Sequence, residues 1–276
     1  MASMLPTLSE QFNNASLKGN YAVSCVPEGG HVESALIGVL TFDGNGRFSG
    51  STLTNLPGAR FGERIQVEAT VEGTYRVDDD GSGFGSLAAT STSSGGLRQD
   101  ITATLLISKA EMAGGTKVAQ EVSLMVDAVD PITGGLSIIL ASRHPDDGEF
   151  SLTSFTGTYG GPGWGRGGQT PSSATGIGAV RFDGNGNFTA VDIQNLPGAT
   201  FAERTKLSQD TPNGQYTVNK DGTGMVSREG ARAHFVVTKA KVSEGIRIAL
   251  EYFFITDDLV PPTANLVTTK VTKRLP

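Results

Sequence analysis

The pentapeptide Phe42-Asp43-Gly44-Asn45-Gly46 returns as Phe182-Asp183-Gly184-Asn185-Gly186, 140 positions further along a chain of 276 residues. The similarity continues in two longer stretches, residues 55–64 and 195–204. The repeat divides the chain into two units of roughly 130 to 140 residues, each the usual size of one domain. We therefore expect an internal duplication, with domains at residues 1–150 and 151–276.

The repeated pentapeptide is typical of a hairpin turn. Asp, Gly and Asn tolerate the backbone conformations that tight turns require, and alternating apolar residues stand on both sides. Similar turns occur at residues 80–83 and 221–224, and 37 glycines punctuate the chain. Each unit has room for about eight short strands, enough to close a sheet without a free edge. The sequence predicts an all-β protein of two tandem antiparallel up-and-down β-barrels.

Two other segments have expected places in this architecture. Residues 7–16, with Leu8 and Phe12 four positions apart, predict a short amphipathic turn that plugs one end of the first barrel. Residues 150–155 predict the junction through which the two barrels pack against each other.

Composition excludes several classes of partner. A net charge of -6, with charged residues at 18 % of the chain, provides no field that would collect phosphates, so we expect no nucleic acid. No transmembrane span is expected. Cys25 is the single cysteine, which rules out an intrachain disulfide and favours a reducing compartment. Residues 1–16 contain no apolar run of signal-peptide length, so we expect a cytoplasmic protein, unless a signal was removed before this numbering begins.

No motif for a cofactor or a metal survives scrutiny. Residues 163–168 satisfy the spacing GxGxxG, but no helix follows to hold a pyrophosphate. The turns at Asp43 and Asp183 begin like calcium loops and then lack the required glycine and glutamate, and the three histidines are scattered. We expect neither a cofactor nor a metal ion.

Two glutamates stand on faces that should be apolar. Alternation from Phe61 places Glu63 beside Ile65 and Val67, and Glu203 occupies the same position in the second unit, while Arg64 and Arg204 point away. Burial raises the pKa of a carboxyl group towards neutrality, as a general acid or base requires. Glu63 and Glu203 are therefore candidate catalytic residues. The alternative is a structural glutamate, bonded to Tyr75 or Tyr216 or reaching water at the barrel rim.

Aromatic residues supply the candidate ligand contacts. Trp164, the only tryptophan, stands in the glycine-rich stretch 160–168, which predicts a loop at the barrel mouth that closes over a ligand. The alternative for Trp164 is an exposed or interface aromatic. Large side chains are expected inside the barrels, where they contact a ligand or fill the space themselves: Phe61, Tyr75, Phe201 and Tyr216.

The strand openings Gly19-Asn20-Tyr21 and Gly157-Thr158-Tyr159, each at the head of a meander of about eight strands, resemble the calycin group, which includes the lipocalins. Lipocalins have Gly-x-Trp at this place, so tyrosine replaces tryptophan here. The resemblance implies a basic residue from the last strand across that ring: Arg143 in the first unit, and Lys270 or Arg274 in the second. It also implies small hydrophobic ligands, and similar barrels include cofactor-free cyclases such as allene oxide cyclase, tandem-barrel Diels-Alderases and the cyclase of scytonemin synthesis.

These observations lead to two functional hypotheses. The first is a cofactor-independent cyclase or isomerase acting on a small hydrophobic or aromatic biosynthetic intermediate, with Glu63 or Glu203 as acid or base and Trp164 as a lid. The second is a non-catalytic carrier or a structural extracytoplasmic barrel. The identity of the ligand, the barrel that binds it and the oligomeric state stay open, with a homodimer as one option.

Overall fold

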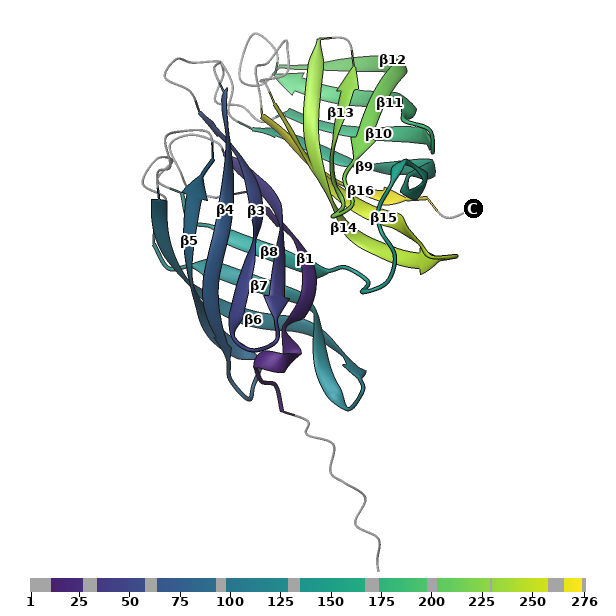
Figure 1. The fold of residues 1–276 in the computed structure, drawn as a ribbon. Helices are drawn as coiled ribbons and strands as arrows, with labels where there is room; N and C mark the ends of the chain where they lie inside the picture. Colours follow the sequence, from purple (N-terminus) through teal and green to yellow (C-terminus); the bar gives the residue numbers. More distant parts are fainter. Residues whose placement is uncertain are drawn as a thin grey trace, which may run out of the picture.

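The computed structural model describes residues 11–26, 34–57, 64–92, 98–128, 135–166, 174–197, 203–228, 230–257 and 266–274. They form two closed antiparallel barrels of eight strands each, side by side (Figure 1). Consecutive strands are neighbours in each barrel, and the last strand pairs with the first. The all-β prediction of two tandem up-and-down barrels is confirmed, and the arrangement fits a calycin-like fold.

The first barrel takes its strands from the first half of the chain. They are β1 (Lys18–Cys25), β2 (Ala35–Asp43), β3 (Arg47–Pro57), β4 (Arg64–Val77), β5 (Ser82–Ser91), β6 (Arg98–Ala113), β7 (Thr116–Val126) and β8 (Ile138–Arg143). The second barrel repeats the order with β9 (Thr156–Arg166), β10 (Ala174–Asp183), β11 (Asn187–Pro197), β12 (Arg204–Val218), β13 (Thr223–Arg228), β14 (Ala231–Ser243), β15 (Ile246–Thr256) and β16 (Leu266–Lys273).

The repeated pentapeptide forms the β2–β3 and β10–β11 hairpins. The Asp43 carboxylate accepts hydrogen bonds from the backbone of Asn45 at 2.7 Å and of Arg47 at 2.9 Å, and Asp183 does the same in the second barrel. The backbone bonds hold the pKa of Asp43 below its usual value, and at Asp183 the side-chain amide of Asn187, donating at 2.8 Å, lowers the pKa most, together with the backbone bonds. The glycines at both positions of each turn have positive φ, which explains why the motif requires glycine.

One end of each barrel is closed by a short helical turn. The turn η1 (Asn14–Ser16) precedes β1, and η2 (Leu152–Ser154) precedes β9. A core tyrosine holds each plug: the Tyr75 hydroxyl donates to the carbonyls of Asn14 and Leu17, and Tyr216 donates to those of Leu152 and Phe155. The predicted plug exists, although Leu8 lies outside the described residues. Tyr75 and Tyr216, predicted to contact a ligand, instead bind the plugs.

The glycine–tyrosine openings of β1 and β9 have a clear physical basis. Gly19 and Gly157 have positive φ, and the tyrosines that follow at 21 and 159 are fully buried. Arg143 lies directly across from Tyr21 on β8, as the resemblance implied. In the second barrel the cation over the Tyr159 ring is Lys273, at 5.6 Å from the ring centre. The prediction of Lys270 or Arg274 was wrong, because Lys270 points outward and pairs with Glu251.

The barrels pack through the outer faces of four strands. Ala22, Ile37 and Val39 of β1 and β2 contact Val236 and Ile255 of β14 and β15 in one apolar cluster. The side-chain amide of Asn55 adds hydrogen bonds to the carbonyls of Thr256 and Asp257. Figure 1 shows β14 and β15 on the side of the second barrel nearest the first. The predicted junction at 150–155 was wrong in this respect: Phe155 lies at the centre of the second barrel's core.

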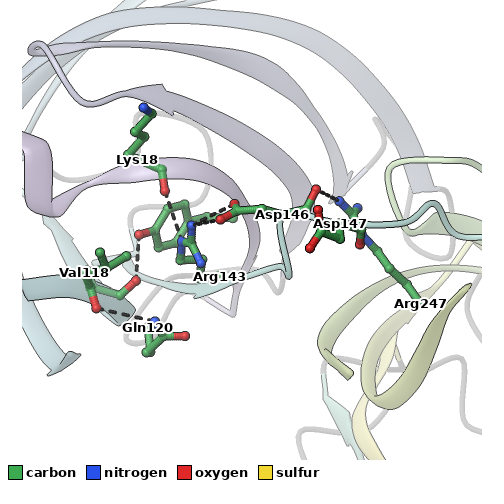
Figure 2. A network of polar contacts seen from close by, with 9 residues as sticks. Lys18, Val118, Gln120, Arg143, Asp146, Asp147 and Arg247 are labelled. Atoms are coloured by element: carbon green, nitrogen blue, oxygen red, sulfur yellow. Dashed lines mark hydrogen bonds and ion pairs between the residues drawn. The ribbon is translucent and has the colours of Figure 1, made fainter. Parts of the chain in front are cut away.

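The segment between the barrels is anchored on both sides (Figure 2). Arg143 binds both oxygens of the Asp146 carboxylate at 2.7 Å and the carbonyl of Lys18 at 3.1 Å. From the second barrel, Arg247 donates to the carbonyls of Asp147 and Asp146 at 3.0 and 3.3 Å. The connection is therefore a braced bridge.

His144 lies buried where the bridge leaves β8. Its Nε2 lies 2.6 Å from the carbonyl of Val237, and its Nδ1 has no hydrogen-bond partner. Burial lowers the pKa of His144 to about 4, although the Val237 carbonyl opposes this shift. The ring is thus neutral near pH 7. No helix among the described ranges has the length and apolar character needed to cross a bilayer.

We predict that acid weakens this fold before the carboxylates titrate. The unfolded chain takes up a proton on His144 near pH 6.5 and the folded chain near 4, so stability falls as pH is lowered between these values. A shift of this size corresponds to on the order of 3 kcal/mol. Urea unfolding across this range should show the loss in the wild type and a smaller one in His144→Gln. Equal slopes for both proteins would contradict the prediction.

Candidate functional site

The second barrel contains a cavity of about 240 Å³. Its apolar surface is aromatic: Phe182, Phe188, Tyr252 and Phe254 line it together with Val271. These residues come from four strands, β10, β11, β15 and β16, and belong to or pack against the second barrel's core. The core fills the end of the barrel that η2 closes, and the cavity lies in the opposite half.

Glycines make this space. Tyr159 and Phe182 point into the barrel, so alternation directs Gly161, Gly163 and Gly165 of β9 and Gly176 and Gly178 of β10 inward too, and all five line the cavity. The first barrel has the same register. Its Val23–Gly38 pair corresponds to Gly161–Gly178 in the second barrel, and its Cys25–Leu36 pair corresponds to Gly163–Gly176. Side chains therefore fill in one barrel what stays open in the other.

Tyr252 places an unpaired hydroxyl at the cavity. The chain has five tyrosines. Four of their hydroxyls donate to backbone carbonyls, at positions 21, 75, 159 and 216. Tyr252 is 4 % exposed and lines the cavity, and its hydroxyl has no hydrogen bond within the described part of the chain. Burial raises its pKa, so it remains a neutral donor. Its counterpart in the first barrel is Val122, since Val122 pairs with Ile107 as Tyr252 pairs with Val237.

A polar cluster stands on the opposite wall. Asp192 accepts a hydrogen bond from Gln194 at 2.5 Å and lies 3.7 Å from a guanidinium nitrogen of Arg228. Arg228 also donates to Thr211 at 2.9 Å and Gln209 at 3.3 Å. Asp192, Gln194, Thr211 and Arg228 all line the cavity. A largely apolar space thus has one wall that can recognise a polar or charged group.

The first barrel has no such cluster at the matching positions. Pairing register equates Asp192 with Thr52 and Thr211 with Val71, because Thr52 pairs with Ala69 and Gly50 with Val71 as their counterparts do. Arg228 lies two residues after the strand partner of Tyr216, and Leu87 lies two residues after the strand partner of Tyr75, so Arg228 corresponds to Leu87. The polar groups are a property of the second barrel.

The wall beside Arg228 is locally open. In the first barrel β4 pairs with β5 from Ala69 onward, but β12 pairs with β13 only from Gln215 to Val218. The preceding residues of β12, from Arg204, have ladder partners only on β11. The Arg228 side chain bridges this gap by its bonds to Gln209 and Thr211.

The same gap explains the outcome for Glu203. It immediately precedes β12 and is exposed, as are all residues from 203 to 210. The buried environment predicted for Glu203 was wrong, because this end of β12 lacks a second neighbouring strand. Glu63, Phe61 and Phe201 lie outside the described residues, so their predicted roles stay predictions.

Trp164 does not lie on a mouth loop. Residues 156–166 form β9, and alternation from Tyr159 directs Trp164 outward, where its side chain is 46 % exposed. It does not line the cavity. The lid prediction was wrong because a run rich in glycine is typical of a loop, whereas this run forms a strand whose glycines leave space inside the barrel.

Sequence reasoning missed Asp192, Arg228 and Tyr252. The available signal was the comparison of the two units at inward positions, which sets glycines against Val23 and Leu36. In the described part of the chain, no three His, Cys, Asp or Glu side chains gather in a way that could hold a metal ion.

Comparisons with known proteins place no family name on this chain. No protein-family model matches it, and no curated protein does. Among solved structures, it is similar to the Aeromonas veronii immune modulator A, with 8 % sequence identity and a TM-score of 0.26 over 93 % of this chain and 94 % of that one.

Proposed function

We propose that the second barrel binds a small, largely apolar molecule that carries at least one polar group. The observation that carries this proposal is the glycine-walled cavity with the unpaired hydroxyl of Tyr252. A hydroxyl that faces a cavity without a partner from the protein can donate a hydrogen bond to a ligand there, which typically contributes about 1 kcal/mol. Apolar walls with a few convergent polar groups are the usual form of a small-molecule site.

The shape and chemistry of the lining favour a flat molecule. Glycines at 161, 163 and 176 let a ring lie against the backbone, and Phe182, Phe188 and Phe254 supply aromatic faces. The polar end of the molecule would face Arg228, whose contact with Asp192 is a single one at 3.7 Å. A ligand hydroxyl, carbonyl or carboxylate can bind there with Tyr252 at the other side.

Filling the cavity should abolish binding. Gly176→Leu introduces the residue that the first barrel has at the matching position, Leu36. An added Cβ meets its nearest atom, the carbonyl oxygen of Ile193, at 3.3 Å, so the thermal melt of the variant is measured first to verify that it folds. Native mass spectrometry of the purified protein and titration with 2-naphthol should show bound ligand in the wild type and in Ile193→Leu, at an outward residue that does not line the cavity, but not in Gly176→Leu. Equal binding by all three folded proteins would reject this cavity.

Two tyrosine variants separate binding from stability. Tyr252→Phe removes the unpaired hydroxyl, so it should weaken 2-naphthol binding by about tenfold without lowering the free energy of unfolding. Tyr159→Phe removes a bond to the Ala249 carbonyl, so it should cost about 1 kcal/mol of stability and leave affinity unchanged. Calorimetric titration and urea unfolding measure both quantities. The reverse pattern would contradict the assignment of Tyr252.

A cofactor-independent cyclase or isomerase is the second candidate, favoured by the carboxylate of Asp192 on the cavity wall. A shaped apolar site with one acid or base can promote ring closure by orienting the substrate. Here Asp192 would take the acid or base role that the sequence suggested for Glu63 and Glu203. Arg228 beside it would stabilise developing negative charge.

Substitution of Asp192 distinguishes a carrier from an enzyme. If the protein is a carrier, the wild type and Asp192→Asn, produced in the same cells, should retain a molecule of the same mass or none. If it is an enzyme, the variant should retain an unconverted substrate that the wild type releases as product. Native mass spectrometry compares the retained masses, with Glu203→Gln as an exposed-carboxylate control.

A further inference from the structure

The contact between the two barrels has two unused counterparts on the same chain. The interface joins the outer face of β1 and β2 in the first barrel to the outer face of β14 and β15 in the second. Because the barrels are duplicates, the second barrel has a face that corresponds to β1 and β2, and the first has a face that corresponds to β14 and β15. Those remaining faces are β9–β11 on the second barrel and β6–β7 on the first.

The β9–β11 face is defined by Trp164, Ile177 and Ile193. These residues match Val26, Ile37 and Leu53 of the inter-barrel contact, since Ile177 pairs with Ile193 as Ile37 pairs with Leu53. Their exposed fractions are 46, 64 and 47 %. Figure 1 shows β10 and β11 on the side of the second barrel away from the first. This face has the apolar residues of an interface and lies open.

The β6–β7 face is defined by Leu106 and Met125. They match Val236 and Ile255, which are 0 and 1 % exposed in the interface. The match follows from strand register. Leu106 pairs with Ser123 as Val236 pairs with Phe253, and Met125 pairs with Thr104 as Ile255 pairs with His234. Leu106 and Met125 are 53 and 52 % exposed. The apolar surface continues onto β8 through Ile138 and Leu140, also more than half exposed.

A polar anchor is duplicated as well. Asn55 reaches from the first barrel to the carbonyls of Thr256 and Asp257. Its counterpart is Asn195, which pairs with Thr175 as Asn55 pairs with Ala35, so the side-chain nitrogen of Asn195 is the matching donor. The carbonyls that match those of 256 and 257 are at Val126 and Asp127, where the Asp127 amide donates to Thr102 as that of Asp257 donates to Arg232.

We propose that copies of this chain associate head to tail, with the β6–β7 face of one copy packed on the β9–β11 face of the next. The contact repeats between chains the packing that joins the barrels within one chain. The second copy is the fitting occupant, because each open face matches one half of an interface that this protein already forms. Two different patches meet, so the contact is heterologous and builds an open chain or a ring.

The first test is the concentration dependence of mass. Sedimentation velocity should show the wild type growing from 28.7 kDa to species larger than a dimer as concentration rises. Leu106→Lys and Ile177→Lys should each stay at the mass of one chain, because a buried lysine without a partner strongly disfavours contact. A wild type that stays monomeric at every concentration overturns the proposal.

The decisive test is mixing. Leu106→Lys retains an intact β9–β11 face and Ile177→Lys an intact β6–β7 face, so an equimolar mixture should form a dimer with one copy of each and nothing larger. A contact between identical patches would not be restored by mixing, and that result overturns the proposal. Val242→Lys, at an exposed residue near the β14–β15 turn, is the control and should associate like the wild type.

Folding of the variants is verified by their thermal melts, which should match the wild type because both residues are more than half exposed. Met125→Lys and Ile193→Lys repeat the mixing test at independent positions of the same two faces. If both variants of one pair self-associate when they are measured separately, other surfaces drive the association, and this result also overturns the proposal.

Discussion

A closed barrel of eight strands encloses a nearly fixed volume, and the side chains at inward positions decide whether that volume is filled. In the first barrel Val23, Leu36 and Leu40 point inward and pack with the aromatic core. In the second, glycines at 161, 163 and 176 leave the backbone bare, and a cavity results. Since strand order and register are the same, the difference in interior side chains explains why the second barrel is open at positions that Val23 and Leu36 occupy in the first.

The two barrels agree in the features that serve folding and differ in their interiors and in the use of their outer faces. Both barrels keep the capped hairpins at Asp43 and Asp183 and the tyrosine hydroxyl that holds the helical plug. Interior polarity differs, because Asp192 and Arg228 replace Thr52 and Leu87. The outer faces differ in use: one pair is buried between the barrels, and the matching pair is open. The first barrel thus supports the second through a braced bridge and a shared apolar cluster.

The failed site predictions have a common physical cause. Alternation assigns a residue to a face of a strand but does not say whether a neighbouring strand covers it, so Glu203 was expected inside and lies exposed where β12 extends past β13. Glycine in a run is typical of a loop, so Trp164 was expected on a lid and lies on a strand. Tyr75 and Tyr216 were correctly taken as interior residues, but a hydroxyl that binds a plug carbonyl is unavailable to a ligand.

The sequence alone determined the duplication, the all-β class, the hairpin turns and the number of strands, because turn chemistry and period-two alternation are local properties of the chain. Only the tertiary structure decided where the cavity of the second barrel lies, which carboxylate reaches it and which of the tyrosine hydroxyls faces it without a hydrogen bond. Those properties depend on residues brought together from different strands, such as Asp192 with Arg228 and Tyr252 with Phe182. These residues become neighbours through strand register and barrel closure, which a short stretch of sequence does not specify.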